Sequence, residues 1–228
     1  MKYLWLFNSI LSMIILVLLS SCSNNPKNDL LNYLEKKYPD DDFSWESNVL
    51  GSEGKSREDY EIIVKSKLIS DAEIHVARQK QYGNIVYLDN YLDYYLRNSV
   101  SEIVVSTFEN ELGKCDVYCR PSPDHLTNSS IAYSADEFLK SKPMYIIYTF
   151  LPKNTSVIDE SKIDSVIKII KKQEWYGISF CFISTKESKK YEEIPLNILV
   201  DENTIDYCNL RYDFNGDNYV IKWSDDHE

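Results

Sequence analysis

The chain has 228 residues, a formal net charge of −11 and an aromatic content of 13%. A hydrophobic content of 43% is too high for a disordered chain. Because so acidic a protein repels phosphate backbones and no Lys/Arg stripe stands out, the composition also disfavours nucleic-acid binding.

The first residues are typical of a secretory signal peptide. Lys2 supplies a positive end, and residues 10–19 form an apolar segment that only Ser12 interrupts. The small residues Ser20 and Ser21 then suit a cleavage site. The competing interpretation is a transmembrane helix, which needs about 20 mostly apolar residues. Asn8, Ser9 and Ser12 interrupt such a span and no basic cluster follows it, so we favour the signal peptide.

The sequence Leu19-Ser20-Ser21-Cys22 resembles the lipobox of bacterial lipoproteins. This resemblance implies that residues 1–21 are removed and that the Cys22 thiol carries a diacylglyceryl group. Acyl chains stabilise membrane attachment by about 0.8 kcal/mol per buried methylene, so two chains anchor a domain stably. We therefore expect a lipid-anchored protein on the extracytoplasmic face of a bacterial membrane, with residues 22–27 as a tether.

Four further cysteines follow the anchor: Cys115, Cys119, Cys181 and Cys208. Outside the cytoplasm they can form disulfides in three connectivities. Cys115 and Cys119 lie four residues apart in a predicted strand, too far apart to pair unless the chain turns. The apolar surroundings of Cys181 and Cys208 suit buried thiols. We favour unpaired cysteines and leave disulfides as the alternative.

The segment 28–120 is predicted to form an N-terminal lobe. A short helix capped by Asn28 or Asp29 ends near Pro39. Strands are expected at 43–50, 59–67 and 72–81, and Gly83-Asn84 suits a turn into a further strand. This helix-then-strands order resembles cystatin-like α+β modules. Residues 90–112 predict one long helix that Gly113 ends, followed by a strand at 115–119.

The segment 130–228 is predicted to form a C-terminal lobe. Ser134 to Glu137 has the pattern of a helix capping box. A strand at 144–151, a helix at 160–173 and a strand at 178–183 predict a right-handed parallel crossover. Asn215-Gly216 between two apolar runs predicts a terminal hairpin.

Overall we predict an α+β fold with two small lobes of mostly antiparallel sheet, each with helices on one face. The boundary is expected around residues 120–130, where Pro121 and Pro123 disfavour regular structure. The alternative is one continuous sheet that spans both halves.

No catalytic or metal constellation is evident. The 213–217 segment lacks the spacing of a calcium loop, and Cys115, Cys119 and His125 have no second ligand pair for zinc. The other histidines, His75 and His227, are poorly placed as catalytic bases. The acid pairs at 192–193 and 225–226 are interpreted as charged residues exposed to solvent. No cofactor is expected.

The most distinctive cluster is a run of tyrosines and acids at 89–96. Tyr91, Tyr94 and Tyr95 are candidate ligand-binding residues, because exposed tyrosines are frequent at interfaces. The interpretation that we favour for this cluster is an N-terminal helical turn in which the acids are favourable charges and the tyrosines pack over the sheet. The expected function is a non-enzymatic binding or accessory module with an envelope protein as partner. A solute-binding lipoprotein and an envelope hydrolase remain as alternatives.

Overall fold

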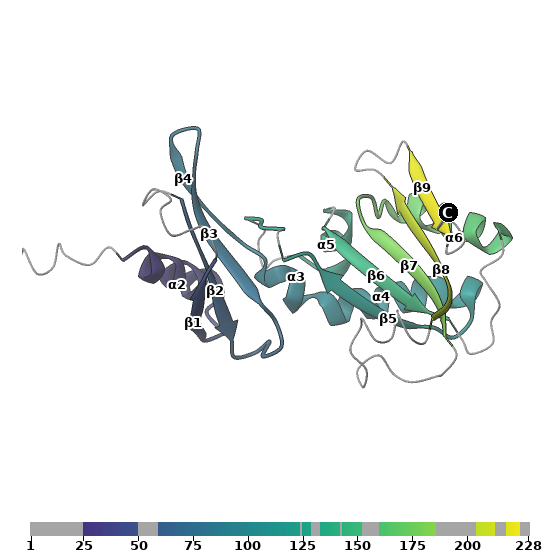
Figure 1. Cartoon of the computed structure of the whole chain (residues 1–228), viewed down its shortest axis with the longest axis horizontal. Helices are drawn as coiled ribbons and strands as arrows, with labels where there is room; N and C mark the ends of the chain where they lie inside the picture. Colours follow the sequence, from purple (N-terminus) through teal and green to yellow (C-terminus); the bar gives the residue numbers. More distant parts are fainter. Residues whose placement is uncertain are drawn as a thin grey trace, which may run out of the picture. The chain divides into compact units, whose positions relative to one another are not determined.

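The described part of the chain contains two sheets, one of four strands and one of five (Figure 1). The computed structural model describes residues 25–49, 59–123, 125–128, 133–141, 143–151, 160–185, 204–212 and 218–223. The chain divides into two compact units, Met1–Leu88 and Asp89–Glu228, called the N-terminal and C-terminal units. Both combine helices with mostly antiparallel strands, which confirms the predicted α+β class.

The N-terminal unit is a helix followed by a four-stranded sheet whose strands are ordered as in the sequence. Ile62 and Val64 on β2 are fully buried, so they form the core-facing side of the strand expected at 59–67. Leu30 and Leu34 supply the buried stripe of the helix α2. The elements are α2 (Pro26–Lys37), β1 (Phe43–Asn48), β2 (Tyr60–Ser66), β3 (Ile74–Gln81) and β4 (Asn84–Asp89).

Helix α2 begins earlier than the sequence analysis placed it. The side chain of Asn25 accepts a hydrogen bond from the backbone N–H of Lys27 at 3.1 Å, and Pro26 is the first helical residue. Proline suits that position because its missing N–H would have no partner there and its φ angle is already helical. The prediction of Asn28 or Asp29 as the cap is therefore wrong, and residues 26 and 27 of the predicted tether belong to the helix.

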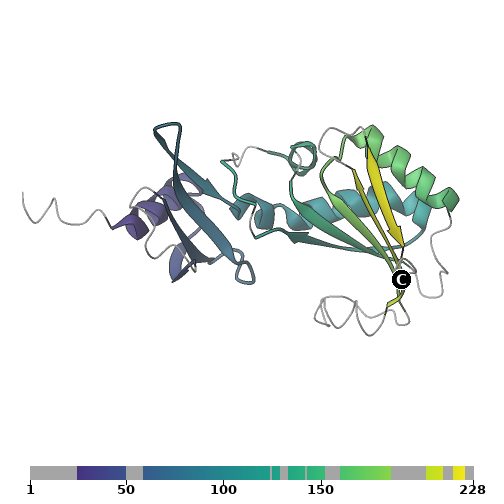
Figure 2. The same cartoon turned by 45° about the horizontal axis from the view of Figure 1, so that its top comes forward.

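The C-terminal unit contains a five-stranded sheet in the order β5 to β9 (Figure 2). Its strands pair antiparallel except β6 and β7, which are parallel, as the strand-helix-strand pattern predicted. The strands are β5 (Asp116–Pro121), β6 (Tyr145–Phe150), β7 (Ser179–Thr185), β8 (Thr204–Tyr212) and β9 (Tyr219–Trp223), and the helices are α3 (Tyr91–Tyr95), α4 (Arg97–Leu112), α5 (Ala135–Lys140) and α6 (Glu160–Gln173).

The predicted helix at 90–112 is divided at Leu96 into α3 and α4. Leu96 still donates its backbone N–H to the carbonyl of Leu92, and its own carbonyl accepts from the N–H of Val100, so helical hydrogen bonds continue across the division. Gly113 ends α4 with a φ of +75°, a left-handed conformation that glycine adopts without strain.

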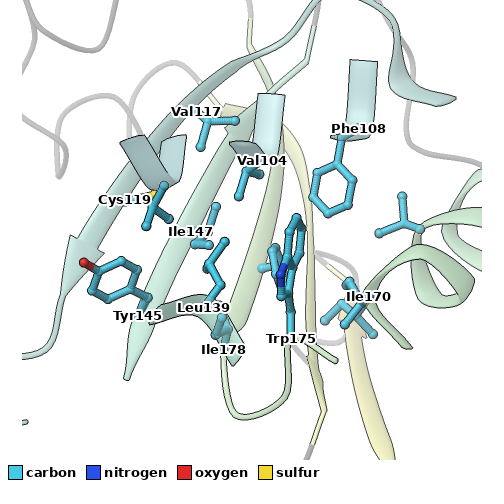
Figure 3. Packing of buried hydrophobic residues seen from close by; sticks show 14 of the residues in the cluster. Val104, Phe108, Val117, Cys119, Leu139, Tyr145, Ile147, Ile170, Trp175 and Ile178 are labelled. Carbon is cyan, nitrogen blue, oxygen red and sulfur yellow. The ribbon is translucent and has the colours of Figure 1, made fainter. Parts of the chain in front are cut away.

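One hydrophobic cluster holds the C-terminal unit together. It joins buried residues of α4, α5 and α6 to one face of the sheet. Figure 3 shows Phe108 and Trp175 in this cluster, where their rings meet edge to face with centroids 6.1 Å apart. Phe108 also contacts the rings of Phe180 and Phe182 on β7. Aromatic residues on three segments therefore fix the helices over the sheet.

The division into units differs from the boundary expected at 120–130. It falls between Leu88 and Asp89, because the apolar stripe of α4 joins the same core as strands β5, β6 and β7. Helix α4 and strand β5 therefore belong to the C-terminal unit. The described strands form two separate sheets, so the alternative of one continuous sheet is wrong. No helix among the described residues has the length and apolar character needed to cross a membrane.

Candidate functional site

The predicted tyrosine surface is only partly exposed. Tyr91 is 1% exposed, Tyr94 is half-buried, and Tyr95 is 47% exposed. The rings of Tyr91 and Tyr95 stack with centroids 5.7 Å apart, one helical turn from each other. Tyr91 lies in the interior of the unit, in agreement with the packed helical turn, and the exposed part of the candidate surface is Tyr95 with part of Tyr94.

The same helix places a buried carboxyl group beside a histidine. Asp93 is 1% exposed, and its Oδ2 atom lies 3.2 Å from Nδ1 of His125. Burial raises the pKa of the Asp93 carboxyl, and the charge of nearby Asp89 adds to this shift, whereas the hydrogen bond with His125 opposes it. The other carboxyl oxygen, Oδ1, is buried and has no hydrogen-bond partner among the described residues. Sequence reasoning had treated Asp93 only as a favourable charge in a first helical turn.

Backbone contacts hold the segment around His125 against the start of α3. Asp89 and Thr127 exchange two backbone hydrogen bonds of 2.9 Å. The Asn90 side-chain amide donates to the Pro123 carbonyl at 3.3 Å. These bonds bring His125, far along the chain, to the Asp93 side chain.

Tyr145 connects this cluster to the sheet. Its hydroxyl donates to the backbone carbonyl of Asp93, and its ring packs edge to face against Phe138 at 5.6 Å. Burial raises the pKa of the Tyr145 hydroxyl well above its ordinary value, so this group remains a proton donor near neutral pH. The Asp93 backbone is thereby fixed by strand β6 as well as by its own helix.

The Asp93–His125 pair has the arrangement by which a carboxylate orients an imidazole. Such a pair supports catalysis when the other ring nitrogen activates a hydroxyl or thiol within hydrogen-bond reach. Among the described residues, no side chain makes a hydrogen bond with Nε2 of His125. The His125 side chain is 20% exposed, whereas that of Asp93 is 1% exposed, so the histidine is the member of the pair that reaches solvent.

A second histidine cluster lies in the N-terminal unit. His75 on β3 is buried, with Nδ1 3.0 Å from Oε1 of Glu61 and Nε2 3.0 Å from Oε1 of Glu73. The hydrogen bond with Glu61 raises the pKa of His75, burial opposes this shift, and Glu73 adds to it. The ring is therefore held between two acceptors, and both are satisfied when the imidazole is protonated.

Glu61 also lines a cavity of about 300 Å³ on strands β2 and β3. The backbone N–H of Lys80 donates to Oδ1 of Asp59, which orders one end of the cavity. A volume of this size lies at the lower end of those that hold small ligands. The lining residues are Asp59, Tyr60, Glu61, Ala77, Arg78 and Gln79.

The surroundings of the cysteine thiols in the described part of the chain make them unreactive. Cys115, Cys119 and Cys181 are free and buried, which agrees with the expectation of unpaired cysteines. Burial raises the pKa of Cys119 to about 12 and those of Cys115 and Cys181 to about 11. Because the thiolate is the nucleophile, such groups react poorly near neutral pH. Among the described residues, no three His, Cys, Asp or Glu side chains are grouped so that they can hold a metal ion.

Several residues that the sequence analysis considered lie outside the described part of the chain. Cys22, His227, the segment 213–217 and the acid pairs at 192–193 and 225–226 are in this group. The backbone of Cys208 lies in β8, opposite Phe182.

The face of the five-stranded sheet opposite the core, called the second face, has an unusual composition. Strand register places Arg120 opposite Ile146, Ile146 opposite Ser179, Ser179 opposite Arg211, and Arg211 opposite Val220. This line across the sheet, called the arginine row, includes two exposed arginines. Ile146 is 38% exposed and Val220 is 58% exposed. In the next line, Tyr118 and Tyr148 are paired with ring centroids 6.5 Å apart.

Comparison with known proteins identifies no family. No family model matches the chain, and no curated protein matches it. One solved structure is similar: the crystal structure of a DUF5037 family protein from Ruminococcus gnavus ATCC 29149. The alignment has 10% sequence identity and a TM-score of 0.38, and it covers 83% of this chain and 92% of that one.

Proposed function

We propose that this chain is a lipid-anchored cell-envelope protein whose folded part is a non-enzymatic binding or accessory module. The sequence Leu19-Ser20-Ser21-Cys22 supports the location, since its cysteine follows an apolar segment near the start of the chain. An anchor confines the module to a thin layer and raises its effective concentration toward other envelope components. Contacts of modest affinity are then sufficient for function.

The composition of the second face of the sheet is the observation that supports the proposed binding function. A sheet with one face on a core usually presents polar residues on the other face. Here Ile146 and Val220 are exposed in line with Arg120 and Arg211. Arginine and tyrosine are enriched at protein interfaces, and exposed aliphatic side chains supply the apolar area that a partner covers.

The Asp93–His125 pair is the observation that favours the hydrolase alternative. Its imidazole is oriented by a carboxylate, as a general base requires. Hydrolysis of an envelope ester or glycan that is lost in His125→Ala but retained in His75→Ala would replace the binding proposal. The solute-binding alternative depends on the cavity lined by Asp59 and Glu61, and a bound small molecule displaced by Glu61→Lys would support it.

The anchor is tested by replacing Cys22 with Ala in the full chain. We expect the wild type to incorporate labelled fatty acid, to be shortened at residue 21 and to sediment with membranes. The Cys22→Ala precursor should remain unlabelled and full-length. Cys119→Ser is a matched control, because this buried cysteine is not part of the lipobox sequence and its replacement should leave labelling unchanged. Lipid labelling of the Cys22→Ala variant would refute the anchor.

A further inference from the structure

We propose that the tip of the β3–β4 hairpin, with Tyr82 in its turn, contacts the surface of the bilayer that holds the lipid anchor. This inference rests on the proposed anchor at Cys22 and goes beyond the proposed binding function, because it assigns a second membrane contact that orients the N-terminal unit. The hairpin tip comprises residues 80–85, all of which are exposed.

Tyr82 lies in the turn of the hairpin, fully exposed and in an unfavourable backbone conformation. It is 104% exposed, and its φ angle is +51°. Gly83 follows with a φ of +85°, so this two-residue turn has the positive φ angles of a type I′ turn. Asparagine and glycine are favoured at such positions, whereas tyrosine is strained there. An exposed aromatic ring at a strained position contributes nothing to the core, which indicates a role in contact.

The hairpin reaches past the strands next to it (Figure 1). Tyr60, the first residue of β2, pairs with Arg78, so residues 79–81 of β3 continue beyond the end of β2. Ile85, at the start of β4, is 45% exposed. The side chains of Tyr82 and Ile85 are therefore presented beyond the body of the sheet.

The hairpin tip and the start of α2 lie at the same end of the sheet. Nη1 of Arg78 lies 3.0 Å from Oδ2 of Asp29, in the first turn of α2. Tyr82 follows Arg78 by four residues, which span about 13 Å in a strand. Asn25 caps α2, and the three-residue step from Cys22 to Asn25 spans at most about 11 Å. An anchor at Cys22 therefore holds this end of the sheet close to the bilayer.

The composition of the hairpin suits the headgroup region of a bilayer. The sequence has 36 acidic residues, yet residues 74–88 contain no Asp or Glu. Asp59 lies at the base of the tip, where its Oδ1 atom accepts the backbone N–H of Lys80 at 2.9 Å, and residues 81–85 beyond it are uncharged. Anionic headgroups therefore repel the tip less than they repel an average segment of this chain. Tyrosine is enriched at membrane surfaces because its ring is apolar and its hydroxyl stays hydrated.

A protein partner fits the tip less well than a bilayer does. A stable protein interface uses about 20–30 residues on each side, whereas the tip is a short exposed segment. Gln81 and Asn84, which flank the turn, supply no charge for specific pairing. A membrane contact needs no large area, because the anchor raises the effective concentration of the tip at the bilayer.

The test uses the full chain in cells, with an aliphatic diazirine amino acid in place of Ile85, so that Tyr82 is retained. The matched control position is Leu68, which is 58% exposed and follows β2 at the opposite end of the same sheet. After illumination, we expect lipid adducts from position 85 and a loss of most of this signal at position 68. Mass spectrometry of the purified chain distinguishes lipid adducts from protein adducts.

Two substitutions of Tyr82 separate the role of its ring from the stability of the turn. Tyr82→Asn should lower the lipid adducts from position 85 about tenfold, because it removes the apolar ring that the membrane surface covers. Since asparagine adopts positive φ angles more readily, this variant should unfold thermally at or above the wild-type temperature. Tyr82→Trp should retain the adducts, because tryptophan is also enriched at membrane surfaces.

The outcomes separate this inference from the proposed anchor. Equal lipid adducts from positions 85 and 68, or adducts that persist in Tyr82→Asn, would overturn the inference and retain the anchor. Protein adducts in place of lipid adducts at position 85 would overturn the inference and retain the contact function. Absence of lipid adducts from a chain that incorporates labelled fatty acid would overturn the inference alone, whereas absence of both adducts and label would overturn the anchor as well.

Discussion

The Nδ1 atom of His75 lies 3.0 Å from Oε1 of Glu61 on the neighbouring strand. The His75 side chain is 10% exposed and that of Glu61 is 20% exposed, so water screens their interaction only in part. The second ring nitrogen is 3.0 Å from Glu73, whose side chain is 60% exposed. The two acceptors thus differ in burial, and Glu61 is the stronger cause of the raised His75 pKa.

This difference predicts unequal effects of the two glutamates on His75. We expect Glu61→Gln to lower the pKa of His75 more than Glu73→Gln does, because solvent screens the exposed carboxylate of Glu73. NMR titration of the imidazole ring protons of His75 in the wild type and the two variants measures which substitution lowers the pKa more. Because the folded pKa is raised, the contribution of His75 to stability is present below about pH 6.5 and is lost as pH rises through the folded value. Equal shifts in both variants would contradict the assignment.

Because the Asp93 carboxyl is buried, we expect the C-terminal unit to lose stability as pH rises. Its folded pKa is raised, chiefly by burial, so ionisation of Asp93 costs stability as pH rises from 3.8 through the folded value. Asp93→Asn removes this ionisation while keeping an oxygen acceptor for His125. We expect the variant to gain stability relative to the wild type over that pH window, as measured by thermal unfolding.

Asp136→Asn is a suitable control for that comparison. The Asp136 side chain is 47% exposed and pairs with Lys140 on the surface of α5. Surface pairs of this kind contribute little to stability. A difference between wild type and Asp93→Asn that stays constant across pH would show that Asp93 does not titrate as the structure indicates.

The aromatic centre of the C-terminal core predicts a large loss of stability on truncation. Phe108 is fully buried and contacts the rings of Trp175, Phe180 and Phe182. Phe108→Ala should lower the free energy of unfolding by about 3–5 kcal/mol, since it removes buried area and leaves a cavity. Urea unfolding measures this change. Leu68→Ala, at a residue that is 58% exposed, should change the free energy by less than about 0.5 kcal/mol.

Local patterns predicted most of the secondary structure correctly. The capping box at Ser134 is present, with the Glu137 side chain accepting from the Ser134 backbone N–H at 2.9 Å. The stripe of α4 is buried at Val100, Val104 and Phe108. These features depend on residues within a few positions of each other, so periodicity and capping chemistry are sufficient to identify them.

Residues in the candidate sites were harder to predict because their partners are distant in sequence. His125 lies 32 positions after Asp93, and the Asp89–Thr127 bridge and the Asn90–Pro123 hydrogen bond bring them together. The sequence left two interpretations of Tyr91, a surface residue or a residue packed over the sheet, and tertiary packing decides for burial. The second face could not be recognised either, since strand register decides which residues of β5 and β8 share a line.

The sequence by itself determined the α+β class, the element order and the lipobox pattern on which the proposed anchoring rests. Each of these depends on local composition and spacing, which a single chain displays directly. Tertiary structure alone decided the division at Leu88, the burial of Asp93 and the alignment of Arg120 with Arg211. The physical reason is that burial and strand register arise from the packing of α4 and α6 on the sheet, a cooperative outcome of contacts between distant segments.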